Sequence, residues 1–527
     1  MFSLTLITPI QADFVRISFY FLLLFLNCTY CYAQVSIREL KLEYGNHAVG
    51  FKHYLSHDSS RTYKRSADWD NQFIPRPIPI SIWYPAPQNQ DSLALLAVSQ
   101  YMEILKEEEE WEHLPNEQIL NWFNYENNAQ NHHHLTEKTS AYLHALPLEG
   151  KFPTIIYAPS IQASSIENFA LCEFLASHGF VVISSPSRGT ESRLMEGGTA
   201  KDVETQAQDI RYLVHIALQS PQTDPSQIAT MGFSFGGLSN VLAQMQNRYI
   251  QAIVSLDGSI KYQYPTLAKS PFADVTKVRV PFIHMAQKDI PKEIMLADKM
   301  DTTLNSSFQF YDRLKYSQAY QLKFNKLTHA YFSSMGVLFE NRDPRQDKSD
   351  AEIMESYRWV ATYTLQFLNT YLKQDPKGLD FLKAVPEENG APKGLITVYS
   401  KEPERTDFTF EDFHEKAKAN NYEHLNELYQ TVRINHPTFE IAEGQLNNLG
   451  LQRTYNPETT HQGIQILSFA TMIFPHSGNL FDSLAEAYLY AGDEEKAIIF
   501  FKKSLALSPD NENAIKRLQQ LEKGLNE

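Results

Sequence analysis

The sequence predicts an α/β fold, with a mostly parallel sheet and helices on both of its faces, followed by an all-helical C-terminal region. Short apolar runs alternate with amphipathic helical segments from residue 152 to residue 372. A glycine-flanked turn at residues 232–236 joins one of these runs to a helix, and a helical repeat marks the end of the chain. Strands that alternate with helices form parallel sheets, because each helix returns the chain to the same edge of the sheet.

Each predicted strand is a short apolar run bounded by polar or turn residues. The run at residues 78–85 alternates with a period of two, and its prolines favour a sheet edge or a strand end. Helices are expected at residues 166–177, 203–218 and 351–372, and Gly179 is expected to end the first of them in a left-handed conformation. The other strands are expected at residues 154–158, 180–184, 228–233, 252–256, 280–285, 320–324 and 395–399.

The turn at residues 232–236 reads G-F-S-F-G, which matches the G-x-S-x-G nucleophile elbow of an α/β-hydrolase. Gly232 and Gly236 provide the room that closely packed backbone requires at such a turn. The following helix, expected to begin near Leu238, presents free N–H groups and a positive dipole end to developing negative charge. Ser234 is therefore the predicted nucleophile, at the carboxyl end of its strand, where active sites of such sheets lie.

A serine hydroxyl needs a base within hydrogen-bond reach and an acid that orients the base. In α/β-hydrolases the order along the chain is serine, acid and histidine. His329 fits the base, because it follows the strand expected at residues 320–324 and precedes the last long helix. His284 lies within an apolar strand and is expected in the core, whereas His178 caps a helix and His215 lies on one.

Two aspartates are candidates for the acid, and the pattern leaves the choice between them open. Asp257 directly follows one strand, and Asp289 follows the next strand along the chain. The carboxyl ends of both strands lie at the same edge of the sheet, so either carboxylate could meet the histidine. The oxyanion hole is expected to use the backbone N–H of Phe235, directly after the nucleophile, and that of Ile161, in an earlier loop.

Several segments resemble the plasma-type (isoform II) platelet-activating-factor acetylhydrolase family. They are L-A-S-H-G-F at residues 175–180, the elbow at residues 232–237, and Leu256-Asp257. The tripeptide W-Y-P at residues 83–85 is similar to the opening strand of bacterial relatives, which grade into dienelactone-hydrolase-like esterases. The resemblance covers roughly residues 75–375.

This resemblance implies a triad of Ser234, Asp257 and His329, because the family takes its acid from a Leu-Asp pair after the strand that follows the elbow. Dienelactone hydrolases and polyester hydrolases take the acid one strand later, which would match Asp289. The resemblance also implies short-chain acyl esters as substrates, lipid esters among them, with no metal and no organic cofactor. The chain departs from the family at residues 159–160, where Pro-Ser stands in place of the usual His-Gly of the oxyanion loop.

The N-terminus predicts export. Arg16 precedes an apolar run at residues 19–26, and small residues end at Ala33, so residues 1–33 are expected to be a signal peptide. The run is shorter than the ~20 residues of a membrane span, and the mature chain is expected to have no transmembrane segment and to be periplasmic or secreted. Cys172 then remains as the single cysteine of the mature chain and is expected to be a buried small hydrophobe.

The net charge of −15 excludes nucleic acid as an expected partner, because no basic stripe is present to bind phosphates. Residues 92–148 are expected to be a mostly helical insertion in a hydrolase domain at residues 34–384, and to be placed where a cap over the active site could form. Within it, the acidic run at residues 107–110 is expected on a solvated helix face, and the three histidines at residues 132–134 are expected in a loop rather than in a metal site.

Residues 385–442 are expected to form a linker and a helical segment. After them, residues 443–527 match two tetratricopeptide-like repeats, in which Pro475 precedes Pro509 by the 34-residue period. Two such repeats are fewer than the number usually needed for stability, so they are expected to lean on neighbouring structure. Repeats of this kind bind a helix or an extended peptide, which makes a peptide or protein partner an expectation.

Together these patterns predict an exported serine hydrolase that cleaves carboxylic esters through an acyl-enzyme. One alternative is a catalytically impaired hydrolase fold that acts as a repeat-mediated scaffold, which the unusual Pro159-Ser160 pair motivates. Another alternative is a serine peptidase on the same fold.

Overall fold

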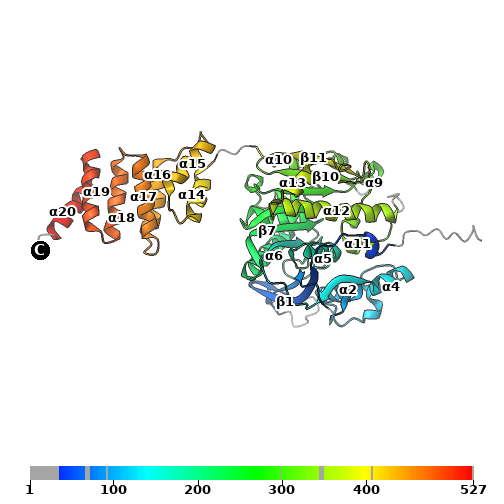
Figure 1. Ribbon diagram of the computed structural model, residues 1–527. Helices are drawn as coiled ribbons and strands as arrows, with labels where there is room; N and C mark the ends of the chain where they lie inside the picture. Colours follow the sequence, from blue (N-terminus) through cyan, green and yellow to red (C-terminus); the bar gives the residue numbers. More distant parts are fainter. Residues whose placement is uncertain are drawn as a thin grey trace, which may run out of the picture. The chain divides into compact units, whose positions relative to one another are not determined.

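The computed structural model describes residues 35–65, 72–90, 93–297, 299–342, 349–404 and 408–524. The signal peptide expected at residues 1–33 lies outside these ranges. The chain divides into two compact units, Met1–Glu404 and Arg405–Glu527 (Figure 1). Among the helices of the described ranges, none combines the length and apolar character that crossing a membrane requires.

One sheet organises the first unit, and within the described residues it has eleven strands in the order β11-β10-β9-β8-β7-β5-β6-β2-β1-β4-β3. The six strands from β10 to β6 run parallel, while β1 and β2 form a long antiparallel hairpin, and β11 is antiparallel to β10. The strands are β1 (Ala48–Tyr63), β2 (Ile74–Ala86), β3 (Leu95–Ala97), β4 (Lys138–Leu143), β5 (Phe152–Ala158), β6 (Val181–Ser184), β7 (Thr223–Phe233), β8 (Ile250–Leu256), β9 (Phe282–Ala286), β10 (Ala319–Phe324) and β11 (Ile396–Lys401).

Two apolar cores lie on the two faces of this sheet, because successive side chains of each strand point to opposite faces. On β7, for example, Met231 and Phe233 belong to one core, whereas Ile228 belongs to the other. The first core is covered by α5 (Phe169–Ser177), α11 (Ser334–Phe339) and α12 (Asp350–Tyr371), and the second by α6 (Ala200–Gln219) and α7 (Gly236–Met245). This is the predicted α/β-hydrolase fold, and the fold class is confirmed.

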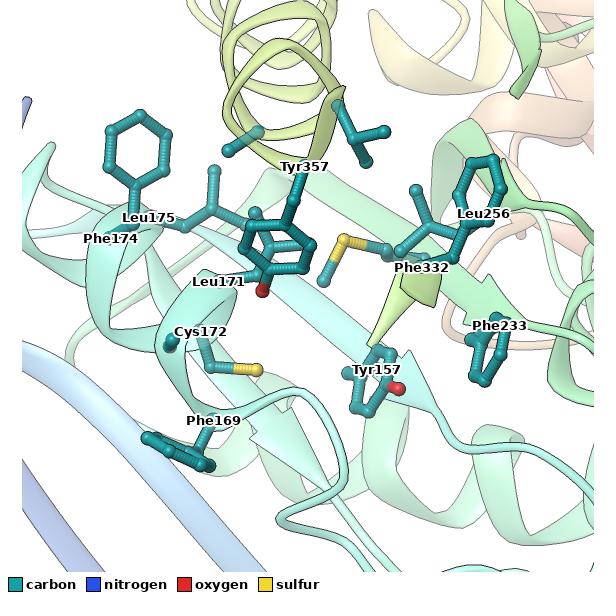
Figure 2. Packing of buried hydrophobic residues seen from close by; sticks show 14 of the residues in the cluster. Tyr157, Phe169, Leu171, Cys172, Phe174, Leu175, Phe233, Leu256, Phe332 and Tyr357 are labelled. Atoms are coloured by element: carbon teal, nitrogen blue, oxygen red, sulfur yellow. The ribbon is translucent and has the colours of Figure 1, made fainter. Parts of the chain in front are cut away.

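Cys172 lies in the first core, as predicted. Figure 2 shows its sulfur among the apolar side chains of α5 and of its neighbours, with Phe169 and Tyr157 nearby. The thiol is fully buried and free. Gly179, just after α5, has a φ of 85°, the left-handed conformation expected for a helix end.

The proline-rich strand β2 is an interior strand, although its prolines favoured an edge or a strand end. It pairs with β1 along its length, but with β6 only at Ser81, Ile82 and Trp83. Three of its prolines lie at residues 75–79, where β1 is the single neighbour. A proline without an N–H is tolerated there because no second strand requires that donor.

The insertion at residues 92–148 begins and ends in the sheet, through β3 and β4, and is therefore less helical than predicted. Between these strands it carries α2 (Val98–Glu108), a 3₁₀ turn η2 (Asn116–Gln118), α3 (Ile119–Trp122) and α4 (Ala129–Thr136). Two expectations about the side chains of this insertion need correction, one for the histidines and one for the acidic run. The three histidines at residues 132–134 lie in α4 rather than in a loop, and His134 is buried with its Nδ1 2.6 Å from Glu137 Oε1.

The acidic run at residues 107–110 is only partly solvated, because Glu107 is exposed but Glu108 and Glu110 are buried. Glu108 is buried and accepts hydrogen bonds from Ser165 N at 2.9 Å and from Ser165 Oγ at 2.5 Å. Glu110 is also buried and accepts from Tyr63 Oη at 2.8 Å. These partners lie about 50 residues away along the chain, so a local pattern of charges could not indicate them.

The remaining helices of the first unit are short, and they precede β1, connect strands or follow α12. They are the α-helices α8 (Tyr264–Leu267), α9 (Lys292–Ala297), α10 (Gln309–Arg313) and α13 (Pro376–Lys383), and the 3₁₀ helices η1 (Arg38–Leu40), η3 (Val275–Lys277), η4 (Thr302–Asn305) and η5 (His329–Phe332). The hydrolase unit extends beyond the expected end at residue 384, because β11 pairs with β10 from Ile396 to Lys401. The segment expected as a linker thus supplies the last strand of the sheet.

The second unit is all-helical in the part that the structure describes. Its helices pack as consecutive neighbours, α16 on α17 and α18 on α19, with α20 following (Figure 1). Phe413 of α14 stacks on Phe469 of α17, so the helices before residue 443 share one core with those after it. The helices are α14 (Phe410–Ala419), α15 (Leu425–Asn435), α16 (Glu443–Thr454), α17 (Thr460–Ile473), α18 (Gly478–Tyr490), α19 (Glu494–Leu507) and α20 (Glu512–Gly524).

Candidate active site

Ser234 lies between the end of β7 and the start of α7, in a turn with little free space. Its φ is +51°, a value that non-glycine residues adopt rarely and that recurs at functional turns. The glycines on both sides are required sterically, because a Cβ on Gly236 would overlap the carbonyl oxygen of Ala158, and one on Gly232 would overlap Gly236. The backbone therefore holds the hydroxyl at the carboxyl end of the central strands.

His329 begins η5, after β10, and its ring reaches the serine. Its Nε2 lies 2.9 Å from Ser234 Oγ. The main-chain N–H of His329 donates to Gln287 Oε1 at 3.1 Å, which fixes the start of η5 near the end of β9. Because the side chain of His329 is 43% exposed, solvent water can reach it.

Asp257 completes the row of hydrogen-bonded side chains. Its Oδ2 lies 2.5 Å from His329 Nδ1, and its Oδ1 accepts from Gln287 N and from Tyr262 Oη, both at 3.0 Å. The carboxylate is fully buried, so these donors replace the water that would otherwise solvate its charge. The other candidate acid, Asp289, is 55% exposed and pairs with Lys323 Nζ at 3.0 Å.

The pKa values of this pair shift in the directions that favour an ion pair. Burial lowers the pKa of His329, but the hydrogen bond and charge of Asp257, together with the charge of Glu167, outweigh burial and raise the pKa above its ordinary value. Burial raises the pKa of Asp257, but its contacts with His329 and with Gln287 N outweigh burial and lower it. An imidazole beside a carboxylate of this kind can accept a proton and hold it.

The other histidines considered from the sequence lie away from the serine hydroxyl. His284 is fully buried on β9, with its Nδ1 2.9 Å from Ser255 Oγ, and burial lowers its pKa to about 3. It is a neutral core histidine, as predicted. His178 is the C-cap of α5, and His215 is exposed on α6.

Two backbone N–H groups near Ser234 are available for a ligand. Within the described residues, neither Phe235 N–H nor Ile161 N–H donates a hydrogen bond to another protein group. Phe235 is the N-cap of α7, so its N–H lies at the positive end of the helix dipole. Ile161 lies in the wall of the same pocket as Ser234. These are the two donors that the sequence predicts for an oxyanion hole.

A pocket of about 500 Å³ opens above Ser234 and His329. The insertion contributes much of its wall, including the aromatic rings of Trp111, Trp122 and Phe123. Trp111 stacks on Phe123 with ring centroids 5.6 Å apart. The insertion thus covers the carboxyl ends of the parallel strands.

The charged side chains in the pocket wall are carboxylates apart from His329. Glu109, Glu167 and Glu340 line the pocket, and no Lys or Arg is among the described residues that line it. Glu109 is paired with Arg193, whose guanidinium lies 5.2 Å from the centroid of the Trp111 ring. An anionic ligand would therefore meet unfavourable charge beside the serine.

Glu167 is a site residue that the sequence did not indicate. Its Oε2 accepts from Ser160 N at 2.8 Å and from Tyr157 Oη at 3.1 Å, and its Oε1 accepts from Ser160 Oγ. No motif singles it out, because its partners are set by the way the loop after β5 folds back.

Within the described ranges, no three His, Cys, Asp or Glu side chains gather closely enough to hold a metal ion.

Comparisons with known proteins bear on the first unit. Residues 140–331 match the dienelactone hydrolase family. No curated protein matches the chain. Among solved structures, a ferulic acid esterase from Streptomyces cinnamoneus is similar to it, with 18% sequence identity and a TM-score of 0.46 over 67% of this chain and 96% of the esterase chain.

Proposed function

We propose that the protein is a serine hydrolase that cleaves carboxylic esters through an acyl-enzyme, on an α/β-hydrolase fold in which residues 140–331 match the dienelactone hydrolase family. The observation that carries the proposal is the row of hydrogen bonds from Ser234 through His329 to Asp257, with distances of 2.9 and 2.5 Å. The family match and the fold also support a hydrolase that acts on esters.

In the proposed reaction, His329 Nε2 takes the proton of Ser234 as Oγ attacks the ester carbonyl carbon. The resulting oxyanion accepts hydrogen bonds from the N–H groups of Phe235 and Ile161, each worth ~10²–10³ in kcat. The imidazolium, stabilised by Asp257, then protonates the departing alcohol. Water, activated by His329, hydrolyses the acyl-enzyme and restores Ser234.

The position of the acid supports the resemblance to platelet-activating-factor acetylhydrolases. Asp257 follows β8, the strand next to the elbow strand in the sheet, which is the position implied by the resemblance to platelet-activating-factor acetylhydrolases. Asp289, the position implied by dienelactone and polyester hydrolases, pairs with Lys323 instead. We therefore assign the role of the acid to Asp257.

The pocket favours an uncharged ester with an apolar or aromatic group. Its volume of about 500 Å³ suits a small ester, and Trp111, Trp122 and Phe123 offer ring faces to an apolar group. Glu167 and Glu340 disfavour a carboxylate on the substrate, whereas the charge of Glu109 is offset by Arg193. A screen of neutral, anionic and cationic p-nitrophenyl esters of increasing acyl length checks this selectivity.

The decisive experiment compares wild-type protein with Ser234→Ala, using p-nitrophenyl acetate and a fluorophosphonate probe. We expect wild-type turnover and labelling, and a loss in Ser234→Ala on the scale of ~10⁶, because a triad acts as a unit. Equal turnover in the two proteins would exclude Ser234 as the nucleophile. A wild-type protein that neither hydrolyses esters nor takes the probe would favour the alternative of a non-catalytic scaffold.

We further propose that the protein is exported, to the periplasm or the medium, through the signal peptide at residues 1–33. We also propose that residues 443–527, within the C-terminal unit, are two tetratricopeptide-like repeats that bind a peptide or protein partner. The consecutive packing of α16 to α19 supports the second proposal. N-terminal sequencing of the exported protein tests cleavage after Ala33. A pull-down with isolated residues 405–527, compared with a control in which the surface residues of this unit are scrambled, tests the binding of a partner.

A further inference from the structure

Glu167 lies in the wall of the pocket, yet the proposed chemistry gives it no step. Three donors converge on its carboxylate: Ser160 N at 2.8 Å, Tyr157 Oη at 3.1 Å, and Ser160 Oγ. Two of the three come from one residue of the loop that follows β5. A carboxylate that binds both the N–H and the hydroxyl of Ser160 holds that residue in one orientation.

Within residues 160–163 of the loop, one N–H is left for a ligand, and Glu167 helps to decide which one. Ser160 N donates to Glu167, Gln162 N to Met195 Sδ at 3.3 Å, and Ala163 N to Ser160 O at 3.3 Å. Within the described residues, Ile161 N alone among these four donors has no protein acceptor. The Ser160–Glu167 pair therefore leaves the Ile161 N–H as the available donor among residues 160–163.

The same short segment also holds the part of the chain that follows the histidine. The carbonyl oxygen of Glu167 accepts from Met335 N at 3.1 Å. The neighbouring Asn168 side chain donates to Phe332 O at 2.9 Å and accepts from Ser334 N at 3.0 Å. Residues 167–168 thus connect the loop before α5 to the segment that begins at His329.

We propose that Glu167 is a positioning residue that holds the Ser160–Ile161 turn so that the Ile161 N–H serves as an oxyanion donor. It would do so where the His-Gly pair of the resembling family is replaced by Pro159-Ser160. This inference rests on the proposed esterase function. The carboxylate acts through the loop and does not touch the substrate.

A secondary effect follows from the charge of Glu167. Burial lowers the pKa of His329, whereas the hydrogen bond and the charge of Asp257 raise it. The charge of Glu167 raises the pKa further, by a smaller amount. Removing the charge but keeping the hydrogen bonds should lower the pKa of His329. The position and the charge of Glu167 can therefore be separated by choice of substitution.

Two substitutions make this separation. In Glu167→Gln, the amide oxygen can accept from Ser160 N and Tyr157 Oη, while the amide nitrogen donates to Ser160 Oγ, so every contact survives without the charge. Glu167→Leu keeps the volume but removes the acceptors. With p-nitrophenyl acetate, we expect Glu167→Leu to lower kcat about 100-fold, the loss of one oxyanion donor, with KM within about threefold of wild type.

For Glu167→Gln we expect kcat within about fivefold of wild type and an acid limb of the pH–rate profile that moves to lower pH. Ser160→Ala is a milder second variant, because it removes the hydroxyl contact but retains the N–H. It should lower kcat by about threefold to tenfold with KM unchanged, and it keeps the proposal testable if Glu167→Leu does not fold.

Glu173, on the helix α5 that follows Glu167, offers a matched control. It is fully buried and accepts from Tyr101 Oη at 2.8 Å and Ser140 N at 2.9 Å, but it has no contact with the oxyanion loop. Glu173→Leu should lower the Tm while the folded fraction, titrated with the fluorophosphonate probe, keeps wild-type kcat. A Glu167→Leu enzyme with near-wild-type kcat would overturn the proposal, and so would equal kcat losses in the two Leu variants. If wild-type protein is inactive and Ser234 takes no probe, the proposed function fails first and this inference falls with it.

Discussion

Substitution of Asp257 by Asn tests the acid most directly, because the structure dictates how the new amide must lie. Asp257 Oδ1 accepts from two donors, Gln287 N and Tyr262 Oη, both at 3.0 Å. An Asn amide satisfies these donors only if its oxygen takes the Oδ1 position. Its NH₂ group then replaces Oδ2, which lies 2.5 Å from His329 Nδ1.

This orientation reverses the tautomer of the histidine. An NH₂ donor facing Nδ1 requires Nδ1 to be the acceptor, so the ring proton moves to Nε2. Nε2 is the atom 2.9 Å from Ser234 Oγ, and once protonated it cannot take the serine proton. The same reversal in a serine-protease triad costs about 10⁴ in kcat, or about 5.5 kcal/mol of transition-state stabilisation, and we expect a loss of that order here.

The assay is steady-state hydrolysis of p-nitrophenyl acetate, with active sites counted by the fluorophosphonate probe. Asp289→Asn is the control, because Asp289 is 55% exposed and pairs only with Lys323 in the contacts described. Such surface pairs contribute ~0–1 kcal/mol, so Asp289→Asn should keep kcat within about twofold. An Asp257→Asn enzyme within about tenfold of wild type, or a larger loss in Asp289→Asn, would refute the assignment of the acid.

Two further predictions follow from the same geometry. Burial lowers the pKa of His329, but its contacts with Asp257 prevail and raise that pKa, so activity should be lost as the pH falls through a value above the ordinary imidazole pKa of about 6.5. A pH–rate profile of kcat/KM measures the midpoint of this loss. A midpoint well below about 6 would contradict the prediction. Gly236→Ala should lower the free energy of unfolding by about 1–3 kcal/mol and reduce activity, because the new Cβ would overlap the carbonyl oxygen of Ala158. The control is Gly444→Ala, whose Cβ would meet no atom within 4 Å and which should change the free energy of unfolding by less than about 1 kcal/mol. A urea titration measures both.

Much of the hydrolase unit could be predicted from sequence because its central parallel strands are buried on both faces. A parallel strand such as β5 or β8 is a continuous apolar run between turns, and that pattern is local. The elbow is equally local, because Gly232 and Gly236 are needed within two residues of Ser234. The order of residues along the fold was enough to prefer His329 over His284, which the apolar character of its strand placed in the core.

Long-range contacts were beyond such reasoning. Glu108 and Glu110 read as a solvated charge run, yet both are buried, because Ser165 and Tyr63 reach them from distant parts of the chain. The unit boundary at residues 404–405 was also missed, since the pairing of β11 with β10 is decided by strand neighbours rather than by composition.

By itself, the sequence determined the fold class and the candidate nucleophile and base, because these depend on hydrophobic periodicity, on glycine at a tight turn and on chain order. Only the tertiary structure brings Asp257, and not Asp289 at the neighbouring strand end, into contact with His329. The two carboxylates differ in the direction of the side chain: that of Asp257 is buried and points to the imidazole of His329, and that of Asp289 points to Lys323 near the surface. The contacts of Glu167 were likewise visible only in the structure. Its carboxylate meets its partners once the loop that follows β5 has folded back onto it.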